Sequence, residues 1–291
     1  MLPNFIVIGA AKAGTTALYW YLAEHPAVFM SPVKETNFFA YGLDDAGQLL
    51  YGIPELHQFP VTTLSEYEKL FANAGDAAAV GEASPIYLEC PQAAGRIRTR
   101  IPDARLICGL RHPVERAYSD YLMYLRLRGE QLEPNRDLVA SAVWAQPDSH
   151  WMRIGRYHGQ LERYYEAFPE RQIHVFLFDD LKRDLLGTVQ AIYRFVGVDP
   201  SFVPDLETPH NIGGMPASRQ LERLFSSSTL RRAVAPLVPQ RAAKWVRRLR
   251  ARNMVKAPTL PADLRKELTL HFRDDIIQTS RLIGRSLEHW L

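Results

Sequence analysis

The residues with the clearest chemical potential lie close to the N-terminus. A short apolar run, Phe5 to Ile8, is followed by small residues between Gly9 and Gly14, and an apolar segment begins at Thr15. This order predicts a buried strand, a flexible loop and a helix. In that layout, backbone N–H groups and a helix N-terminus bind a phosphate or an anion of similar size. The anion-binding residues that we predict are Ala11, Lys12, Ala13, Gly14, Thr15 and Thr16.

The position of the lysine separates this loop from the nucleotide-triphosphate loop. The spacing from Gly9 to Gly14 matches G-x-x-x-x-G-K-[ST], but Thr15 stands where that motif has its lysine, and Lys12 lies inside the loop. A lysine at the helix start reaches terminal phosphates, whereas a lysine at the crest of the loop lies against the anion itself. We therefore expect a phosphoryl-like donor other than ATP. A generic anion-binding loop and a degenerate ATP loop remain open as alternatives.

The string K-x-G-T-T, from Lys12 to Thr16, resembles the 5′-phosphosulfate loop of sulfotransferases that use 3′-phosphoadenosine-5′-phosphosulfate (PAPS). The resemblance implies that PAPS is the cofactor and 3′-phosphoadenosine 5′-phosphate (PAP) its product. It assigns Lys12, with the N–H groups of residues 13–16, to the charge that builds on the departing bridging oxygen. It also assigns the hydroxyls of Thr15 and Thr16 to the 5′-phosphate. We expect no catalytic metal, because the lysine and the helix dipole supply positive charge.

A second string, K-E-x-x-F-F from Lys34 to Phe39, looks like the segment of the glycan-type sulfotransferases that carries the general base. The resemblance assigns that catalytic role to Glu35. A carboxylate beside a lysine, flanked by aromatic rings that exclude water, can abstract a hydroxyl proton near neutral pH. The alternative is a solvated Lys34–Glu35 pair with Phe38 and Phe39 in the core. Some relatives use a histidine as the base, which keeps four further candidates: His25, His57, His112 and His150.

An arginine and a serine further along the chain are candidates for binding a second phosphate. Arg111 ends the apolar run 105–111, and Ser119 falls in the second turn of a helix predicted over 114–128. An arginine at the carboxyl end of a strand faces the position where nucleotides bind in open α/β sheets. The string R-x-P-x-x-R-x-x-S-x-Y looks like the family's 3′-phosphate motif, so the resemblance assigns Arg111 and Ser119 to that group. Arg116 is expected to pair locally.

Three weaker family marks complete the predicted site. Tyr157 lies in a G-x-Y-x-x-x-L-x-x-[WY] element and is expected to contact the nucleotide or the acceptor. The glycine pair before Arg219 matches the position of a late loop that covers the 3′-phosphate, although ordinary loop structure is the alternative. The segment from Glu82 resembles E-K-S-P-x-Y, but Ala83 replaces the lysine, which weakens a direct transfer to heparan-type substrates. Glu82 and Ser84 either line the site or serve the fold.

These residues need a frame that brings separate strand ends together. Apolar runs bounded by turn signals predict strands over residues 5–8, 28–30, 79–88, 105–111 and 173–178. Helical spacing predicts a helix beginning at 15, one beginning at 154, and others over 65–72 with Ser65 as N-cap, 91–100, 114–128, 184–196 and 263–290. We expect one α/β domain over 1–291, with a P-loop-like fold, a central parallel sheet of about five strands and helices on both faces. The basic helical part, about 218–291, would pack on it.

Composition is typical of a soluble globular protein. The chain has 291 residues, of which 47% are hydrophobic and 23% charged, and a net charge of +3. That charge suits an anionic cofactor but falls short of a nucleic-acid-binding signature. No apolar run approaches the roughly 20 residues of a membrane span, and the N-terminus leaves no room for a signal peptide. We therefore expect a cytoplasmic protein, with Cys108 a buried free thiol and no disulfide to Cys90.

One basic segment favours a different kind of contact. Arginine and lysine crowd residues 231–252, and no acidic residue occurs between 223 and 262. With its interleaved apolar residues, this segment would suit an anionic membrane surface or an acidic polymer. The alternative is a solvated basic face on a packed helix. The sequence does not indicate an oligomeric state.

Together the motifs indicate a sulfotransferase that moves the sulfonate of PAPS to a hydroxyl or amine of a small-molecule or glycan acceptor, such as a sugar, a lipid or a secondary metabolite. Loops 41–63 and 130–152 are expected to select the acceptor. A P-loop kinase acting on a small molecule is one alternative, and it predicts dependence on ATP and Mg²⁺. A non-catalytic anion or membrane-surface binder is the other; there, charge reversal near Arg247 would destroy function and a change of Lys12 would not.

Overall fold

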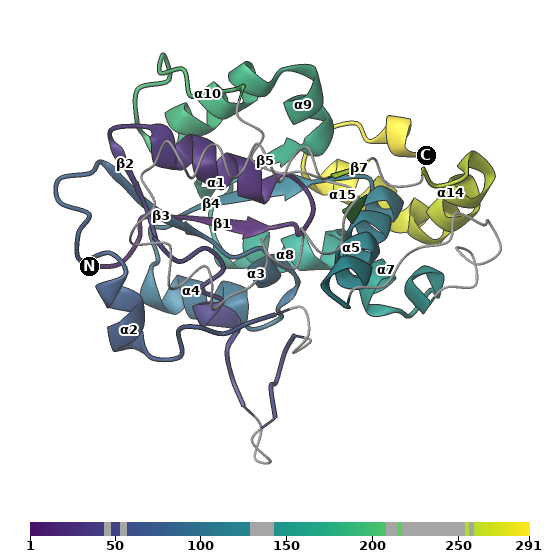
Figure 1. Cartoon of the computed structure of the whole chain (residues 1–291), viewed down its shortest axis with the longest axis horizontal. Coiled ribbons are helices and arrows are strands. Elements are labelled where there is room, and N and C mark those ends of the chain that lie inside the picture. The colour runs from purple at the N-terminus through teal and green to yellow at the C-terminus, as the bar shows by residue number, and fades with distance from the viewer. Residues whose placement is uncertain (44–47, 53–56, 129–142, 208–214, 217–253, 256–258) are drawn as a thin grey trace.

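A five-stranded parallel sheet forms the centre of the molecule (Figure 1). The computed structural model describes the chain except for residues 44–47, 53–56, 129–142, 208–214, 217–253 and 256–258. Across the sheet the order is β2 (Val28–Met30), β3 (Ala79–Ala83), β1 (Phe5–Gly9), β4 (Arg105–Leu110) and β5 (Ile173–Leu177). Every residue of β1 is buried, as its unbroken apolar run predicts for a strand covered on both faces. The predicted α/β fold is confirmed.

Helices cover both faces of the sheet, and the side chains of β1 alternate between them. Phe5 and Val7 belong to a core cluster beneath α1 (Thr15–Glu24) and α10 (Leu185–Val196), with α9 (Phe178–Arg183) next to α10. Ile6 and Ile8 belong to a second cluster on the other face. The helices of that face are α2 (Leu64–Lys69), α3 (Ile86–Glu89), α4 (Ala93–Arg100) and α8 (His158–Ala167). Figure 1 shows the two layers above and below the sheet.

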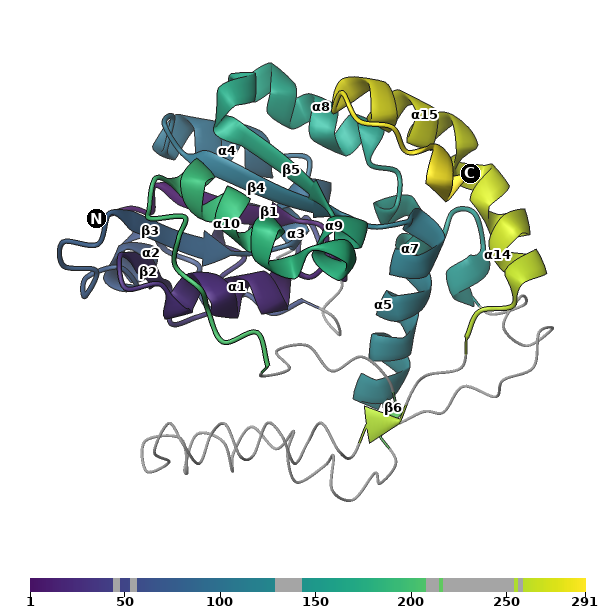
Figure 2. The same cartoon turned by 90° about the horizontal axis from the view of Figure 1, so that it is seen from above.

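A third group of helices lies beyond the carboxyl ends of the strands (Figure 2). It consists of α5 (Pro113–Arg128), α7 (His150–Ile154), α14 (Ala262–Thr269) and α15 (Arg273–Leu282). Helix α14 packs on α5, and α15 packs on α8. Leu264, Phe272 and Trp290 join the same core cluster as Ile6 and Ile8, so the described C-terminal helices share the core of the sheet. A single domain over 1–291 stays a prediction, because 217–253 lie outside the described residues.

Short elements complete the described architecture. Strands β6 (Met215–Pro216) and β7 (Met254–Val255) form an antiparallel pair. Single 3₁₀ turns occur at Phe38–Ala40, Val143–Ala145, Glu170–Gln172, Leu270–Phe272 and Glu288–Trp290. Both cysteines are buried free thiols, as predicted for Cys108. Among the described helices, none combines the length and the apolar character that a membrane span requires.

Two predicted boundaries in the first half of the chain are wrong. The strand expected over 79–88 ends at Ala83, because Pro85 starts helix α3 as its N-cap. Helix α2 begins at Leu64 with Thr63, rather than Ser65, as its N-cap. The Thr63 side chain accepts from the N–H of Glu66, and the Glu66 carboxylate accepts from the N–H of Thr63, which is a capping box.

Two predicted helices in the second half are interrupted. The helix expected from residue 154 is split, with α7 ending at Ile154 and α8 starting at His158. Gly155 lies in the gap, where a Cβ would come within 2.9 Å of the Phe272 ring. The closing helix expected over 263–290 is broken by the turn at Leu270–Phe272, and it ends at Leu282, just before Gly284 with φ of 63°. Close packing and a left-handed turn therefore override the helical pattern.

Candidate active site

The loop between β1 and α1 has the backbone of an anion-binding site. Lys12 and Gly14 both have positive φ, 68° and 90°, and α1 begins at Thr15 without a side-chain cap. The first N–H groups of a helix have no partner within the helix, so they are available to an anion. The φ of 90° favours glycine at position 14, and a Cβ there would also come within 2.6 Å of a terminal methyl of Leu181, which would have to shift.

A cavity of about 220 Å³ opens beside this loop. Its wall includes Ala11, Lys12, Gly14, Thr15 and Thr16 from the predicted anion-binding set. Glu35, which follows β2 in the chain, lines the same cavity. The two residues predicted to be catalytic, Lys12 and Glu35, therefore lie at one site, although they follow β1 and β2, which are separated by β3 in the sheet.

Lys12 has a weak partner in a desolvated position. Its ammonium donates to the thioether sulfur of Met123 at 3.3 Å, and a thioether is a poor acceptor. Burial lowers the pKa of Lys12 to about 8, while the nearby Asp120 carboxylate acts in the opposite direction. A bound anion would supply the strong partner that the ammonium lacks here.

This shift predicts a pH dependence of PAP binding. An anion favours protonated Lys12, so the affinity is expected to be full below the free pKa of about 8 and to fall as pH rises through it. The decline approaches about tenfold per pH unit until the pKa of the complex is reached. Isothermal titration calorimetry with PAP between about pH 7 and 10 measures it. The variant Lys12→Met should lose this dependence, and an affinity of the wild type that stays level to the top of the range would contradict the assignment.

Glu35 stands at the cavity in a different environment from the one predicted. Its carboxylate pairs with Lys34, and 49% of its side chain is exposed. Phe38 stacks on Tyr67 with ring centroids 4.5 Å apart, and Phe39 packs edge-on against the same ring. The expectation that these aromatic rings exclude water from Glu35 is wrong. Glu35 and Asn37 both have positive φ, and after these two turns the rings of Phe38 and Phe39 pack on the core. The Glu35 carboxylate remains exposed to solvent.

A buried carboxylate, Glu82, fixes the segment that carries Glu35. Glu82 is 0% exposed, and burial raises its pKa. Its Oε2 accepts from the hydroxyls of Thr36 and Ser84 at 2.8 and 2.7 Å, and its Oε1 accepts from Tyr67 and Tyr87, each at 2.8 Å. Glu82 and Ser84 therefore serve the fold and do not line the cavity. Thr36 connects this network to its neighbour Glu35.

Replacing Glu82 tests this network. The variant Glu82→Gln puts an NH₂ group where two hydroxyls donate, so those donors lose their acceptor in a closed site. We expect the free energy of unfolding to fall by about 3 kcal/mol. Urea denaturation measures it, with the exposed Glu162→Gln as a matched control expected within about 0.5 kcal/mol of wild type. A loss below about 1 kcal/mol would show that the network contributes little.

Arg111 lies directly after β4, on the other side of the anion-binding loop. Its guanidinium donates to the carbonyl of Lys12 at 3.2 Å and lies over the Phe178 ring, 4.8 Å from the centroid. Glu115 is 3.9 Å away. The Nε of Arg111 is buried and has no hydrogen-bond partner in the described structure, and burial lowers the pKa of the group. A buried, unpaired donor on a partly buried cation fits an anionic ligand.

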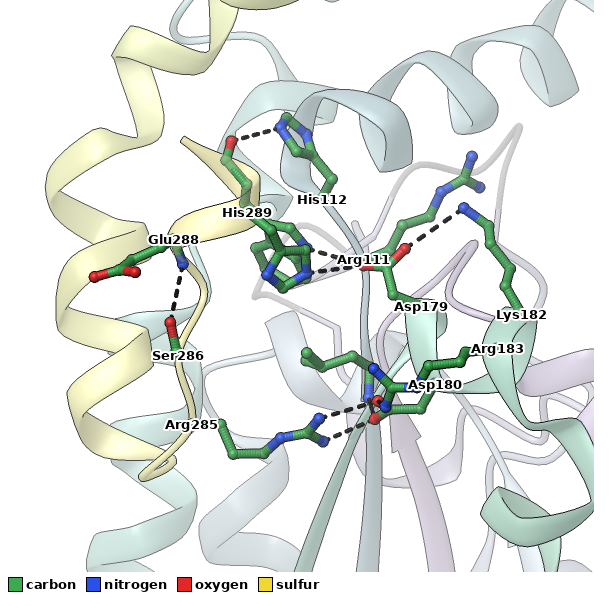
Figure 3. Close-up of polar contacts among 12 residues, drawn as sticks. Arg111, His112, Asp179, Asp180, Lys182, Arg183, Arg285, Ser286, Glu288 and His289 are labelled. Carbon is green, nitrogen blue, oxygen red and sulfur yellow. Dashed lines mark hydrogen bonds and ion pairs between the residues drawn. The ribbon is translucent and has the colours of Figure 1, made fainter.

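Residues near the C-terminus pair with two aspartates of α9 (Figure 3). The carboxylate of Asp180, in α9, accepts hydrogen bonds from both terminal guanidinium nitrogens of Arg285, at 2.7 and 3.0 Å. The neighbouring Asp179 accepts from the indole N–H of Trp290 at 3.0 Å and pairs with His289. The partners of the two aspartates lie more than 100 positions away, so no local signal links them.

The remaining predicted ligands differ in how the structure places them. Tyr157 is 1% exposed, and its hydroxyl donates to the carbonyl of Arg111 at 2.8 Å, so it lies behind Arg111 and not in the cavity. Ser119 lies partly buried in α5, and its contact with a phosphate stays a prediction. Arg219 lies outside the described residues. Arg116 is fully buried and pairs with Asp120 at 3.3 Å, which confirms the predicted local pairing.

The four histidines kept as alternative bases fall into two groups. His25 is buried and bonds to the carbonyl of Asp199, and His112 is buried and bonds to the carbonyl of Trp290. Burial lowers the pKa of His112 to about 4. His57 lines the cavity, and His150 contacts its ring, with centroids 6.0 Å apart. Position thus favours His57 and His150 over the other two.

Sequence analysis missed several side chains of the cavity. Asp120, Met123 and Arg126 come from α5, where a spacing of three residues places them along one side of the helix. Glu89, the last residue of α3, also lines the cavity, and burial raises its pKa to about 7. No motif indicated Glu89, because the expected strand continued past Ala83.

Comparison with known proteins gives one consistent family. The family model described as "Sulfotransferase family" matches residues 3–202. The membrane-associated sulfotransferase kil1 of Dictyostelium discoideum is 34% identical over 59% of this chain, and human heparan sulfate glucosamine 3-O-sulfotransferase 3B1 is 27% identical over 86%. The matches span only 33% and 60% of those relatives. The crystal structure of a sulfotransferase from Alicyclobacillus acidocaldarius superposes with a TM-score of 0.68 at 29% identity, covering 100% of this chain and 99% of that one.

Proposed function

The chain belongs to the sulfotransferase family, and from that premise we propose that it transfers the sulfonate of PAPS to a hydroxyl or amine of an acceptor. Family membership and the likeness to a solved bacterial sulfotransferase support this reaction class. The observation that carries the proposal is that Lys12 and Glu35 line one cavity beside an anion-binding loop. A cation for the leaving phosphate and a base for the acceptor proton are the two groups that such a transfer needs.

Three features of the chain fit PAPS as the donor. The N-terminus of α1 carries no side-chain cap, the Lys12 ammonium donates to a thioether sulfur, and the buried Nε of Arg111 has no partner among the described residues. The first two suit the 5′-phosphosulfate end, and Arg111, together with Ser119, suits the 3′-phosphate. PAPS supplies an activated sulfonate on a phosphate leaving group.

The residues of the chain divide the work of the transfer. Lys12 and the N–H groups of residues 13–16 stabilise negative charge on the departing phosphate oxygen. The hydroxyls of Thr15 and Thr16 bind the 5′-phosphate. Glu35 accepts the proton of the acceptor, and Lys34 pairs with its carboxylate. Tyr157 positions Arg111 through the Arg111 carbonyl.

The name of a relative and one departure in the sequence indicate classes of acceptor. The name of the human relative specifies a heparan sulfate glucosamine, which makes a sugar one acceptor class here. Ala83 occupies the lysine position of the family's E-K-S-P-x-Y element, and this departure favours acceptors other than heparan-type chains, including a lipid or a secondary metabolite. Parts of the loops 41–63 and 130–152 lie outside the described residues, as does the basic stretch 231–252. Their roles at an acceptor or an anionic surface, and the cytoplasmic location, stay predictions.

Transfer of labelled sulfonate tests the reaction class. The full chain is incubated with ³⁵S-labelled PAPS and fractionated metabolites or glycans of its host. We expect label in an acceptor fraction and one equivalent of PAP released for each label transferred. Binding of PAP without transfer to any fraction would favour the non-catalytic anion binder, and phosphate transfer from Mg²⁺–ATP would favour the kinase.

A further inference from the structure

Three side chains from separate segments converge next to the proposed active site. They are His57 from the loop after Tyr51, Glu89 at the end of α3, and His150 at the start of α7. One ligand-type atom of each, an imidazole nitrogen or a carboxylate oxygen, lies within 4.8 Å of the others. The Nε2 of His57 and the Oε1 of Glu89 are 3.7 Å apart. The proposed transfer mechanism, with Glu35 as the base, gives none of these three side chains a role.

The individual atoms have the orientation of ligands. Tyr51 donates its hydroxyl to Oε2 of Glu89 at 3.0 Å, which orients the carboxylate and leaves Oε1 towards His57. The Nε2 of His150 is buried and has no hydrogen-bond partner in the described structure. A buried, unpartnered imidazole nitrogen is costly unless something binds it. A carboxylate fixed by a second hydrogen bond is the usual support of a metal ligand.

The donor set and its spacing select a class of ion. Two imidazoles and one carboxylate are typical ligands of Zn²⁺, whereas Mg²⁺ and Ca²⁺ prefer oxygen throughout. A tetrahedral ion with bonds of about 2.0–2.1 Å separates its ligand atoms by about 3.4 Å. The 3.7 Å between His57 Nε2 and Glu89 Oε1 is close to that separation. The largest separation among the three ligand atoms is at most 4.8 Å, and small side-chain rotations would shorten it to the same value.

We propose that His57, Glu89 and His150 form a binding site for one divalent transition-metal ion, best matched by Zn²⁺. The proposal departs from our expectation of a site without metal. Its fourth coordination position would be open to water or to an acceptor group, because His57 and Glu89 line the same cavity as Lys12 and Glu35. The ion would also connect the two segments that we expect to select the acceptor, since His57 belongs to 41–63 and His150 to 130–152.

Binding of Co²⁺ tests the metal site in the absence of a sulfonate donor and a sulfonate acceptor. The result is therefore independent of the proposed transferase activity. The full chain is stripped with a chelator and titrated with Co²⁺, whose visible absorption rises strongly in a four- or five-coordinate site. We expect saturation at one equivalent and loss of the bands when Zn²⁺ is added. Equilibrium dialysis with Zn²⁺ gives the affinity.

Variants assign the binding to these residues. We expect Glu89→Gln and His150→Asn each to weaken Zn²⁺ binding at least 100-fold, and Tyr51→Phe to weaken it about 10- to 100-fold through the orientation of Glu89. His271→Asn, at an exposed histidine, is the matched control and should leave the affinity unchanged. Circular dichroism checks that each variant is folded. The proposal would be overturned if the wild type did not bind Co²⁺ or Zn²⁺ at one equivalent. It would also be overturned if folded Glu89→Gln and His150→Asn bound Zn²⁺ as tightly as the wild type.

Discussion

Replacing Lys12 by methionine is expected to lower kcat/KM for sulfonate transfer by about 10²- to 10³-fold. Methionine keeps much of the volume of the side chain and removes the charge. The ammonium lies in a desolvated position against the Met123 sulfur, where an electrostatic interaction is stronger than in water. Most of the loss should appear in kcat, because charge on the bridging oxygen grows only as the transfer proceeds.

Steady-state kinetics with PAPS and an identified acceptor measures this effect. Lys69→Met removes an exposed lysine from the last turn of α2 and serves as the matched control, expected to retain wild-type activity. The affinity for PAP should fall less than kcat does. If Lys12→Met kept kcat within about threefold of wild type, the loop lysine would have no catalytic role.

The second large effect is expected at Glu35. Glu35→Gln keeps the shape of the side chain but removes the proton acceptor, so kcat should fall by about 10²- to 10⁴-fold. Binding of PAP should change little, since Glu35 follows β2 whereas the anion-binding loop follows β1. The loss is therefore expected in kcat with KM for PAPS nearly unchanged.

The controls for Glu35 also separate the possible bases. Glu162→Gln alters an exposed carboxylate in α8 and should leave the kinetics unchanged. His57→Asn and Glu89→Gln alter two further titratable side chains at the cavity. If Glu35→Gln remained nearly as active as wild type while a histidine variant lost turnover, the base would be the histidine and the present assignment would be wrong.

The parts of the site that could be predicted depend on residues adjacent in the chain. The run from Phe5 to Thr16 encodes a strand, a loop and a helix start in order, so the anion-binding geometry follows from local preferences. Arg111 was placed by the same kind of reasoning, because a strand end followed directly by a helix sets its position. The parallel sheet of about five strands needed only the apolar runs and the rule that strands joined by helices lie parallel, whereas the order of the strands was not predicted.

What could not be predicted depends on contacts between distant residues. Tyr157 is held behind Arg111 because the carboxylate of Asp275, in α15, accepts from the N–H groups of Tyr157 and His158. Asp275 is 118 positions from Tyr157, and no spacing pattern reports such a cap. The same holds for Arg285 on Asp180. The solvent exposure of Glu35 was missed for a related reason, since two left-handed turns decide where Phe38 and Phe39 point.

The most direct test of the account compares two nucleotides by calorimetry on the full chain. Lys12 in the loop, with Thr15 at the helix start, predicts tight binding of PAP at one equivalent and weak or no binding of Mg²⁺–ATP. Arg111→Gln should weaken PAP binding if the 3′-phosphate is held there. Tight binding of Mg²⁺–ATP together with no binding of PAP would contradict the central claim that this loop accepts a phosphosulfate donor.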